Sequence, residues 1–389
     1  MNSHMSINHI ITRLLIASCI FFASIAQAAN TIPAAPKLAA NGYVLLDFNS
    51  GQIIAENNAD QRMEPASLTK MMSTYVVGHE LKAGNISLQD KTTISKKAWR
   101  MPGSRMFVEV GKQVDVESLL KGIIIQSGND ATVAMAEFIA GSEDAFASLM
   151  NNYAKRLGML NTNFVNSTGL PDAEHYTTPH DMAILGSALI REFPEHYKWY
   201  AIKKFTFNNI TQYNRNKLLW RDKSVDGIKT GHTESAGFCL VASANRDDMR
   251  LVSVVLGTKS DSARVEESQK LLSYGFRFYR SHKLYDANTE ISTTELWKGI
   301  TDTVSLGLLK DLYVVIPRGQ YKQLKPSINF ESIIEAPINK HQVLGSLTVK
   351  LNDKTISERS LVALSAVEQG GWWKRLVDWF LLLIKGWFG

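Results

Sequence analysis

Patterns typical of β-strands stand on both sides of a long helical region, and this order restricts the folds open to the chain. The first two strands are joined by the turn sequence Asn49-Ser50-Gly51. Pro65 ends the extended segment, and helical periodicity follows until strands return. The predicted strands are residues 42–48, 52–55, 204–208, 236–244 and 250–257. Helices are predicted for residues 67–81 and 264–279, and helical periodicity dominates residues 117–159 and 179–200, where glycines break it into segments. This order predicts an α+β domain whose helix-flanked sheet contains both ends of the segment.

The pattern changes after about residue 284. Short alternating runs, such as residues 313–316 and 343–349, are then separated by prolines and glycines as far as residue 367. No cluster of catalytic side chains stands out in this part of the sequence. We therefore expect a catalytic domain over residues 29–284, followed over residues 285–367 by a small all-β domain that acts as a spacer or partner surface.

The first 28 residues have the composition of an export signal. Arg13 precedes an apolar run over residues 14–25, and Ala26-Gln27-Ala28 has the small residues of a cleavage site. A run of about 12 residues is too short to span a bilayer. In an alternative reading Cys19 is lipidated, but processing there leaves very little apolar run after Arg13. We predict a signal peptide over residues 1–28 and export of the mature chain.

The composition excludes several kinds of partner. The formal net charge is +6, and the basic residues are spread out rather than gathered in a stripe, so nucleic acid is not expected as a partner. No His or Cys cluster has the spacing of metal ligands. Cleavage near Ala28 leaves Cys239 as the one cysteine, in an apolar run that suits a buried side chain. We expect no metal, no cofactor and no internal disulfide.

The C-terminal segment, residues 368–389, is predicted to form an amphipathic helix. Its charged residues Lys374, Arg375, Asp378 and Lys385 fall within one narrow arc at helical spacing. Charges near both ends leave too few continuous apolar residues for a transmembrane span. The aromatic residues expected to anchor the helix are Trp372, Trp373, Trp379, Phe380, Trp387 and Phe388. We expect this helix to lie in the plane of a membrane surface rather than to pack on the domain.

Three short motifs follow one another in the catalytic segment. Ser67-Leu68-Thr69-Lys70 opens the first predicted helix, Ser127-Gly128-Asn129 falls in a break between helical segments, and Lys229-Thr230-Gly231 stands before a predicted strand pair. Each motif alone is common by chance. Three in order, each in a suitable local context, indicate one active site.

The first motif provides a nucleophile and a base. Residues three apart on a helix share a face, so the Lys70 amine can reach the Ser67 hydroxyl. A serine hydroxyl needs a neighbouring base, and a lysine serves as one only when it is neutral. Desolvation and a second nearby cation, Lys229, are expected to lower the pKa of Lys70. Alone, Ser67 would read as a helix cap and Lys70 as a solvated lysine.

The other two motifs provide a proton relay and substrate contacts. Ser127 offers a second hydroxyl, and Asn129 an amide able to position Lys70 and to contact a substrate backbone. Lys229 and Thr230 are expected to bind substrate, while Gly231 lets its backbone approach the strand closely. The backbone N–H groups of Ser67 and His232 are the expected oxyanion donors.

This set of motifs occurs in class A β-lactamases and penicillin-binding proteins. The sequence resembles the low-molecular-mass penicillin-binding proteins, specifically the D-alanyl-D-alanine carboxypeptidases of the penicillin-binding protein 5/6 type. The resemblance is carried by residues 67–72, 127–131, 212–220 and 225–233, and it extends over the β-rich domain and the amphipathic C-terminal segment. It implies a penicillin-binding, β-lactamase-like fold for the catalytic domain.

The resemblance also implies a reaction. Ser67 would be acylated by the penultimate D-Ala of a peptidoglycan pentapeptide, and β-lactam antibiotics would acylate it as mimics. Arg264 occupies the position of the family's arginine for the substrate carboxylate, a role that suits a guanidinium. The enzyme would act in the periplasm, attached by its C-terminal helix to the outer face of the inner membrane, in cell-wall maturation and cell shape.

Three other functions remain as alternatives. A class A β-lactamase would need a Glu-x-x-Leu-Asn pattern between the second and third motifs, and the sequence has none there. A non-catalytic penicillin-sensing receptor would need membrane spans linked to a signalling domain. A scaffold without turnover is disfavoured by the intact motifs.

Overall fold

The computed structural model describes residues 32–330 and 333–388. The predicted signal peptide and its cleavage site lie outside these residues. In the catalytic part, the described residues form a five-stranded sheet in the order β2-β1-β9-β8-β7, with every neighbouring pair antiparallel. Its strands are β1 (Gly42–Asp47), β2 (Ile53–Asn57), β7 (Val225–Thr233), β8 (Gly237–Arg246) and β9 (Met249–Thr258). The predicted union of early and late strands in one sheet is confirmed.

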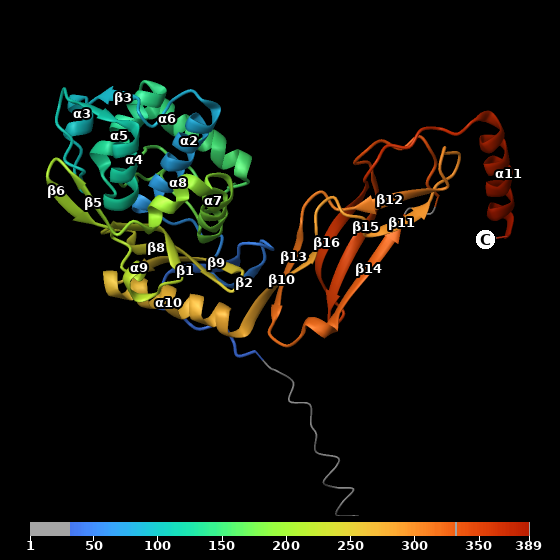
Figure 1. Ribbon diagram of the computed structural model, residues 1–389. Coiled ribbons are helices and arrows are strands. Elements are labelled where there is room, and N and C mark those ends of the chain that lie inside the picture. Colours follow the sequence, from blue (N-terminus) through green and yellow to red (C-terminus); the bar gives the residue numbers. More distant parts are fainter. Residues whose placement is uncertain (1–31, 331–332, 389) are drawn as a thin grey trace, which may run out of the picture. The chain divides into compact units, whose positions relative to one another are not determined.

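Helices cover both faces of this sheet (Figure 1). Helix α10 runs along one face, where a side chain at Gly275 would collide with Leu45 and Leu251. Helices α2 and α7 belong to the core on the other face, together with β1 and β9. The longer helices are α2 (Thr69–Ala83), α5 (Asn129–Ala140), α6 (Glu143–Leu157), α7 (Pro179–Glu192) and α10 (Asp261–Phe278).

Local sequence sets the ends of several helices. The Ser260 hydroxyl accepts from the N–H of Ala263 and begins α10, and Thr178 does the same for α7 ahead of Pro179. Gly84 ends α2 in the left-handed conformation. The shorter elements are η1 (Ala66–Leu68), α3 (Lys96–Trp99), α4 (Val116–Lys121), the π-helical turn η2 (Gly122–Gln126), α8 (Pro194–Tyr197), η3 (Lys198–Ala201) and α9 (Leu218–Arg221).

The structure differs from the expectations in three places. Ser67 lies in the 3-10 turn η1, just before α2 rather than inside it. Residues 204–208 form β5 (Lys204–Phe207), which pairs only with β6 (Ile210–Tyr213) in a separate hairpin, as β3 (Lys91–Thr93) pairs with β4 (Gln113–Asp115). Lys229-Thr230-Gly231 lies inside strand β7, which the sequence does not predict, because this edge strand carries polar residues.

The second part of the chain is β-rich, as predicted. A five-stranded sheet in the order β11-β12-β16-β15-β14 encloses its own core, which includes Leu306, Leu347 and Leu361. Strand β10 begins where the sequence predicts the end of a helix, and it pairs with β13. The elements are β10 (Tyr279–Tyr285), β11 (Ser292–Glu295), β12 (Thr303–Gly307), β13 (Leu312–Pro317), η4 (Tyr321–Gln323), β14 (Leu324–Phe330), β15 (Val343–Leu351) and β16 (Lys354–Ala363).

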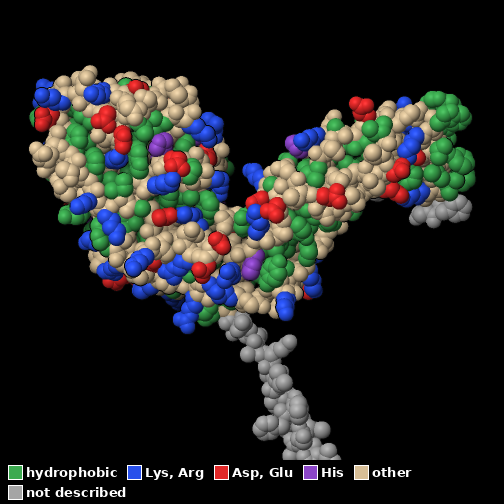
Figure 2. All heavy atoms as spheres, viewed as in Figure 1, with side chains coloured by type: hydrophobic (Ala, Val, Ile, Leu, Met, Phe, Trp, Pro, Cys, Tyr) green, Lys and Arg blue, Asp and Glu red, His purple; other side chains and the backbone are tan. Residues whose placement is uncertain are grey.

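The C-terminal helix α11 (Trp372–Phe388) packs its polar arc against the β-rich domain, so the expectation that it does not pack on the domain is wrong. The buried Asp378 carboxylate accepts from the N–H of Lys298 at 2.6 Å, and Lys385 pairs with Glu295 at 3.0 Å. Most of its described aromatic and aliphatic side chains are exposed, Trp372 by 64% and Trp387 by 85%, and hydrophobic side chains gather along this helix in Figure 2. No helix in the described residues is long and apolar enough to cross a membrane.

Candidate active site

A cleft of about 650 Å³ brings the three sequence motifs together. Its walls come from η1, the start of α5, strand β7, the start of α10 and three loops around residues 103, 169 and 216. The lining residues are Ser67, Gly103, Ser104, Ser127, Asn129, Thr168, Gly169, Leu170, Arg215, Lys217, Thr230, Gly231, His232, Thr233, Phe238, Asp261 and Arg264. Lys70 and Lys229 lie buried behind this surface. The predicted polar site residues thus converge on one cleft.

Ser67 and Lys70 are in direct contact. The Lys70 Nζ lies 3.1 Å from the Ser67 Oγ and donates to the backbone oxygen of Thr168 at 2.6 Å. Lys70 is completely buried, and no carboxylate in the described part of the chain pairs with it. Burial, assisted by the charge of Arg215, lowers the pKa of Lys70 to about 7. A substantial fraction of Lys70 is therefore neutral near pH 7 and able to take a proton from Ser67.

The backbone around the nucleophile is closely packed and locally strained. Ala66 has a φ of 47°, an unfavourable left-handed conformation for a residue with a side chain. Gly169, with a φ of 84°, lies against it, and a Cβ at Gly169 would come within 1.8 Å of the Ala66 carbonyl oxygen. The loop that provides the Thr168 acceptor for Lys70 therefore also holds the turn that presents Ser67.

The second motif presents two polar groups to the cleft. Ser127 has a φ of 66°, and its buried Oγ has no hydrogen-bond partner among the described residues; the same is true of the Asn129 Oδ1. The Asn129 Nδ2 donates to the Pro102 oxygen at 2.7 Å. Within the described residues Asn129 makes no hydrogen bond to Lys70, so the expected positioning of Lys70 by this amide is wrong. Thr168 makes that contact instead.

Asp130, beside Asn129, fixes one wall of the cleft. Its buried carboxylate accepts from the backbone N–H groups of Met106, Phe107 and Val108 at 2.8, 2.9 and 3.2 Å. These bonds hold the loop that carries Gly103 and Ser104 into the cleft. The sequence alone does not indicate this role, because the bonded groups lie in a different loop.

Strand β7 forms the opposite wall and is an edge strand of the sheet. An extended peptide can add to such an edge through backbone hydrogen bonds. Gly231 is favoured for a reason the sequence does not show, because a Cβ there would lie unusually close to η1, 3.0 Å from the Pro65 oxygen and 3.2 Å from the Ala66 Cβ. Glycine therefore lets β7 approach η1, which brings His232 to the cleft that also holds Ser67.

Lys229 is the second buried cation of the site. Its Nζ donates to the Thr230 oxygen at 3.0 Å. Burial, together with the charges of Lys70, Arg215 and Arg264, lowers the pKa of Lys229 well below its usual value. The two buried lysines thus act on each other, as expected from the sequence, and the charge of Arg215 adds to the effect on both.

Two arginines reach the cleft from different elements. Arg264, near the start of α10, is only 6% exposed and donates to the Gly231 oxygen at 3.0 Å. Arg215 donates through its Nε to the Gln126 oxygen at 3.2 Å. Arg215 lies within residues 212–220, where the sequence predicts no function for it; only the fold shows that it lies in the same cleft as Ser67 and Ser127.

Known protein families match both parts of the chain. The family described as D-alanyl-D-alanine carboxypeptidase, peptidase S11, matches residues 29–260. The family described as penicillin-binding protein 5, C-terminal domain, matches residues 279–369. The first match covers more than half of the chain.

Individual proteins are similar over nearly their whole length. D-alanyl-D-alanine carboxypeptidase DacA of Escherichia coli is 45% identical over 389 residues, which cover 97% of this chain and 96% of the relative. DacC of the same organism is 46% identical and covers 95% and 94%. The crystal structure of penicillin-binding protein 5 from Haemophilus influenzae superposes with a TM-score of 0.85 at 43% identity, covering 87% of this chain and all of that one.

Proposed function

The chain belongs to the peptidase S11 family of D-alanyl-D-alanine carboxypeptidases, and from this premise we propose that Ser67 removes the terminal D-alanine of peptidoglycan pentapeptides. The fold and the family are those of the penicillin-binding protein 5/6 type. The observation that carries the proposal is the contact of 3.1 Å between the Ser67 Oγ and the Lys70 Nζ, with Lys70 buried and its pKa lowered to about 7.

In the first half of the reaction Ser67 is acylated. Neutral Lys70 takes the hydroxyl proton while the Ser67 Oγ attacks the carbonyl carbon of the penultimate D-Ala. The backbone N–H groups of Ser67 and His232 stabilise the negative charge on the carbonyl oxygen. The Ser127 hydroxyl passes a proton to the leaving amine and takes up the proton that Lys70 had accepted, so Lys70 becomes neutral again. Lys229 supplies positive charge to this proton network. The C–N bond breaks and the terminal D-Ala leaves.

In the second half a water molecule clears the acyl-enzyme. Lys70, again neutral, takes a proton from the water as its oxygen attacks the ester carbonyl. The ester bond breaks, the Ser67 Oγ recovers a proton, and the shortened peptide leaves. Thr168 keeps the Lys70 amine in place through both halves, since its carbonyl accepts from the Nζ at 2.6 Å.

The edge strand and Arg264 supply the substrate contacts in this proposal. The peptide backbone lies along β7, beside Thr230 and Gly231, and the Asn129 Oδ1 accepts from a backbone N–H group. Arg264 binds the terminal carboxylate, because it provides a buried guanidinium that lines the cleft. A free carboxylate next to the scissile bond distinguishes a carboxypeptidase substrate from an endopeptidase substrate.

β-Lactam antibiotics acylate Ser67 in the same way. The solved relative from Haemophilus influenzae is named a penicillin-binding protein, and the superposition covers its entire chain at 43% sequence identity. Opening of the lactam ring replaces the release of D-Ala, so the leaving amine stays attached to the acyl group. This stable acyl-enzyme gives a direct assay of the nucleophile.

We also propose where the enzyme acts. The signal-like N-terminus supports export, and the exposed aromatic face of α11 supports attachment in the plane of the outer surface of the inner membrane. The exposed Arg375 near the start of α11 suits an anionic lipid surface. There the enzyme would trim pentapeptides during cell-wall maturation and contribute to cell shape.

The test is D-alanine release from diacetyl-Lys-D-Ala-D-Ala by the detergent-solubilised protein. We expect release by the native protein and none by Ser67→Ala, which also fails to retain a fluorescent penicillin. The loss should exceed about 10³-fold, because removal of a nucleophile disables the whole catalytic unit. Stable penicillin attachment to native Ser67 without D-alanine release would instead indicate a sensor or scaffold.

A further inference from the structure

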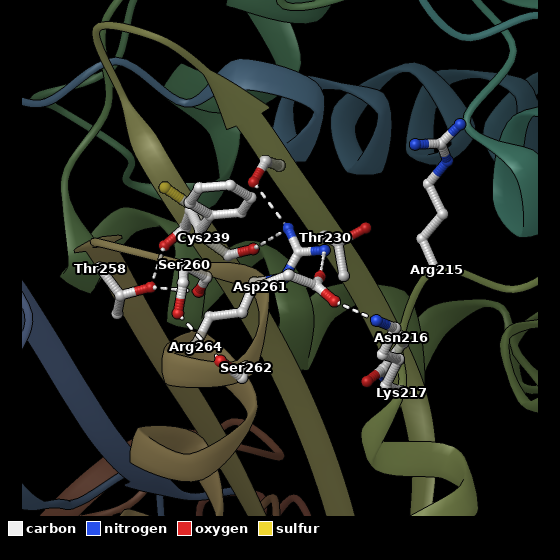
Figure 3. A network of polar contacts seen from close by, with 12 residues as sticks. Arg215, Asn216, Lys217, Thr230, Cys239, Thr258, Ser260, Asp261, Ser262 and Arg264 are labelled. Atoms are coloured by element: carbon white, nitrogen blue, oxygen red, sulfur yellow. Dashed lines mark hydrogen bonds and ion pairs between the residues drawn. The ribbon is translucent and has the colours of Figure 1, made fainter.

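The guanidinium that faces the substrate carboxylate already has a carboxylate of its own chain. Asp261, three residues before Arg264 in the first turn of α10, pairs through its Oδ1 with the Arg264 Nη2. Its other oxygen, Oδ2, lies 2.5 Å from the Lys217 Nζ. Figure 3 shows Asp261 between these two cations, while Arg215 stands apart from the network. All three residues of the network line the cleft.

Arg264 has a second fixed contact that does not depend on Asp261. Its Nη1 donates to the Gly231 oxygen at 3.0 Å, and its guanidinium carbon lies 5.6 Å from the centre of the Phe238 ring. The side chain is 7% exposed. The position of Arg264 is therefore set largely by strands β7 and β8, and removal of Asp261 leaves these contacts in place.

Asp261 and Lys217 are much more accessible than Arg264. Their side chains are 29% and 66% exposed, so both can change rotamer at the mouth of the cleft. Although burial opposes ionisation, the hydrogen bond from Lys217 and the charges of Arg264 and Lys217 keep the pKa of Asp261 below its usual value. Asp261 is thus a carboxylate at neutral pH, and it carries the same charge as the group that the substrate brings.

We infer that Asp261 is a specificity-determining residue. Without substrate its carboxylate pairs with Arg264; the terminal carboxylate of the substrate displaces it from Arg264, and Asp261 then stays paired with Lys217. This rests on the proposed role of Arg264 as the carboxylate-binding residue. No bond is made or broken in the exchange; Arg264 changes one carboxylate partner for another, and Asp261 keeps Lys217. The buried guanidinium keeps a partner when the cleft holds no substrate, which avoids an unpaired buried charge.

The exchange selects for the class of ligand. A ligand with a free carboxylate forms an ion pair with Arg264 in place of the Asp261–Arg264 pair. A ligand whose terminus is an ester or amide forms no such pair, so Arg264 stays paired with Asp261 and the ligand gains no binding energy from it. Asp261 therefore weakens binding of carboxylate ligands without affecting neutral ones. Lys217 has the opposite effect, because it neutralises the displaced Asp261 carboxylate.

The test uses the full-length protein and two thioester substrates, an acyl-D-alanyl thioglycolate with a free carboxylate and its methyl ester. For Asp261→Asn we expect kcat/KM for the carboxylate substrate to rise about fivefold, mainly through a lower KM, since a like charge near the bound carboxylate has been removed. The methyl ester should change by less than about twofold. Glu266→Gln removes an exposed carboxylate from the same helix and should leave both substrates unchanged.

Lys217→Met provides the second arm. It should raise KM for the carboxylate substrate about fivefold in the native background, but by less than about twofold when Asp261 is already Asn. Persistence of the full effect in that background would mean that Lys217 binds the ligand directly, and would overturn the exchange.

Two further outcomes would contradict the inference. A fall in kcat/KM for the carboxylate substrate in Asp261→Asn would show that Asp261 positions Arg264 rather than competing with its ligand. Equal changes for both substrates would show that the effect is not on carboxylate recognition. Failure of the native protein to hydrolyse either substrate would instead contradict the proposed function. Melting temperatures, which should fall slightly for Asp261→Asn through the loss of an acid in the first helical turn, exclude misfolding.

Discussion

The active-site cleft and helix α11 both depart from the usual distribution of polar and apolar groups, in opposite directions. The cleft buries cations: Lys70 and Lys229 are 0% and 3% exposed, and neither forms an ion pair within the described residues. Helix α11 instead exposes large apolar side chains, among them Trp373 and Phe380 at 64% and 59%. Either arrangement costs free energy in water, and such a cost indicates that a function requires it.

The two regions teach different lessons about how function departs from stability. In the cleft the cost is electrostatic and lies within the folded domain, because burial of a charged amine disfavours its protonated form. In α11 the cost arises because apolar side chains face water, and it is removed when these side chains insert into a lipid surface. The electrostatic cost in the cleft should therefore be detected as a change of stability with pH. The cost of the exposed apolar side chains of α11 should be detected as a change of partition between water and lipid.

Replacement of Lys70 by Met should separate stability from catalysis most sharply. We expect acylation by a fluorescent penicillin to fall by about 10²- to 10⁴-fold, since the general base is lost. The melting temperature should rise by several degrees, because an apolar side chain replaces a buried cation. Stopped-flow acylation and calorimetry provide the two measurements.

The pH dependence of this stabilisation follows from the lowered pKa. Between about pH 7 and about pH 10.5, the usual pKa of a lysine, Lys70 is protonated in the unfolded chain but mostly neutral in the folded one, so native stability rises with pH over this window. Below about pH 7 both states are protonated and the full cost is present. The gain of Lys70→Met should thus be greatest at or below pH 7 and shrink towards pH 10. Lys91→Met, at an exposed lysine, should change neither the rate of penicillin acylation nor the melting temperature. A destabilised Lys70→Met would refute the argument.

Removal of one exposed aromatic side chain from α11 should affect only the other half of the comparison. Trp379→Lys, at a side chain that is 51% exposed, should weaken binding to anionic lipid vesicles about tenfold or more, because a charge replaces an anchoring indole. Penicillin acylation should be unchanged, since Trp379 does not line the cleft. Co-sedimentation with vesicles measures the first effect.

The control for this variant lies in the catalytic domain. Leu160 is 78% exposed but lies outside α11, so Leu160→Lys should leave vesicle binding unchanged. Equal losses in the two variants would show that general surface hydrophobicity, rather than α11, determines membrane attachment. Loss of the whole segment after Gly371 should reproduce and exceed the effect of Trp379→Lys.

The sequence predicts those parts of the fold and site whose signal is local. Ser67 and Lys70 are three residues apart, so their contact follows from helical geometry, and β1, β8 and β9 follow from apolar runs of strand length. Strand β7 is missed, because an edge strand that lines a polar cleft has no hydrophobic alternation. The hydrophobic pattern of a strand is weak where its residues line a polar active site instead of packing into a core.

Contacts between distant residues could not be predicted. The acceptor for Lys70 is Thr168, 98 residues away, and the groups held by Asp130 lie 22 to 24 residues before it. The expected Asn129–Lys70 contact is wrong for the same reason: motif spacing states which residues meet in the cleft but not which atoms bond. Arg215 enters the site only through the fold, yet its charge acts on both buried lysines.

The smallest expected effect tests this missed residue. Arg215→Met removes a positive charge that lowers the pKa of Lys70, so that pKa should rise, and the acid limb of penicillin acylation should move from about pH 7 to higher pH. Arg100→Met, at an exposed arginine that does not contribute to the shift of Lys70, should leave the limb in place. A uniformly lower rate with an unmoved limb would assign Arg215 to substrate binding alone. A moved limb would show that the buried amines of the cleft are tuned by charges the linear motifs do not contain.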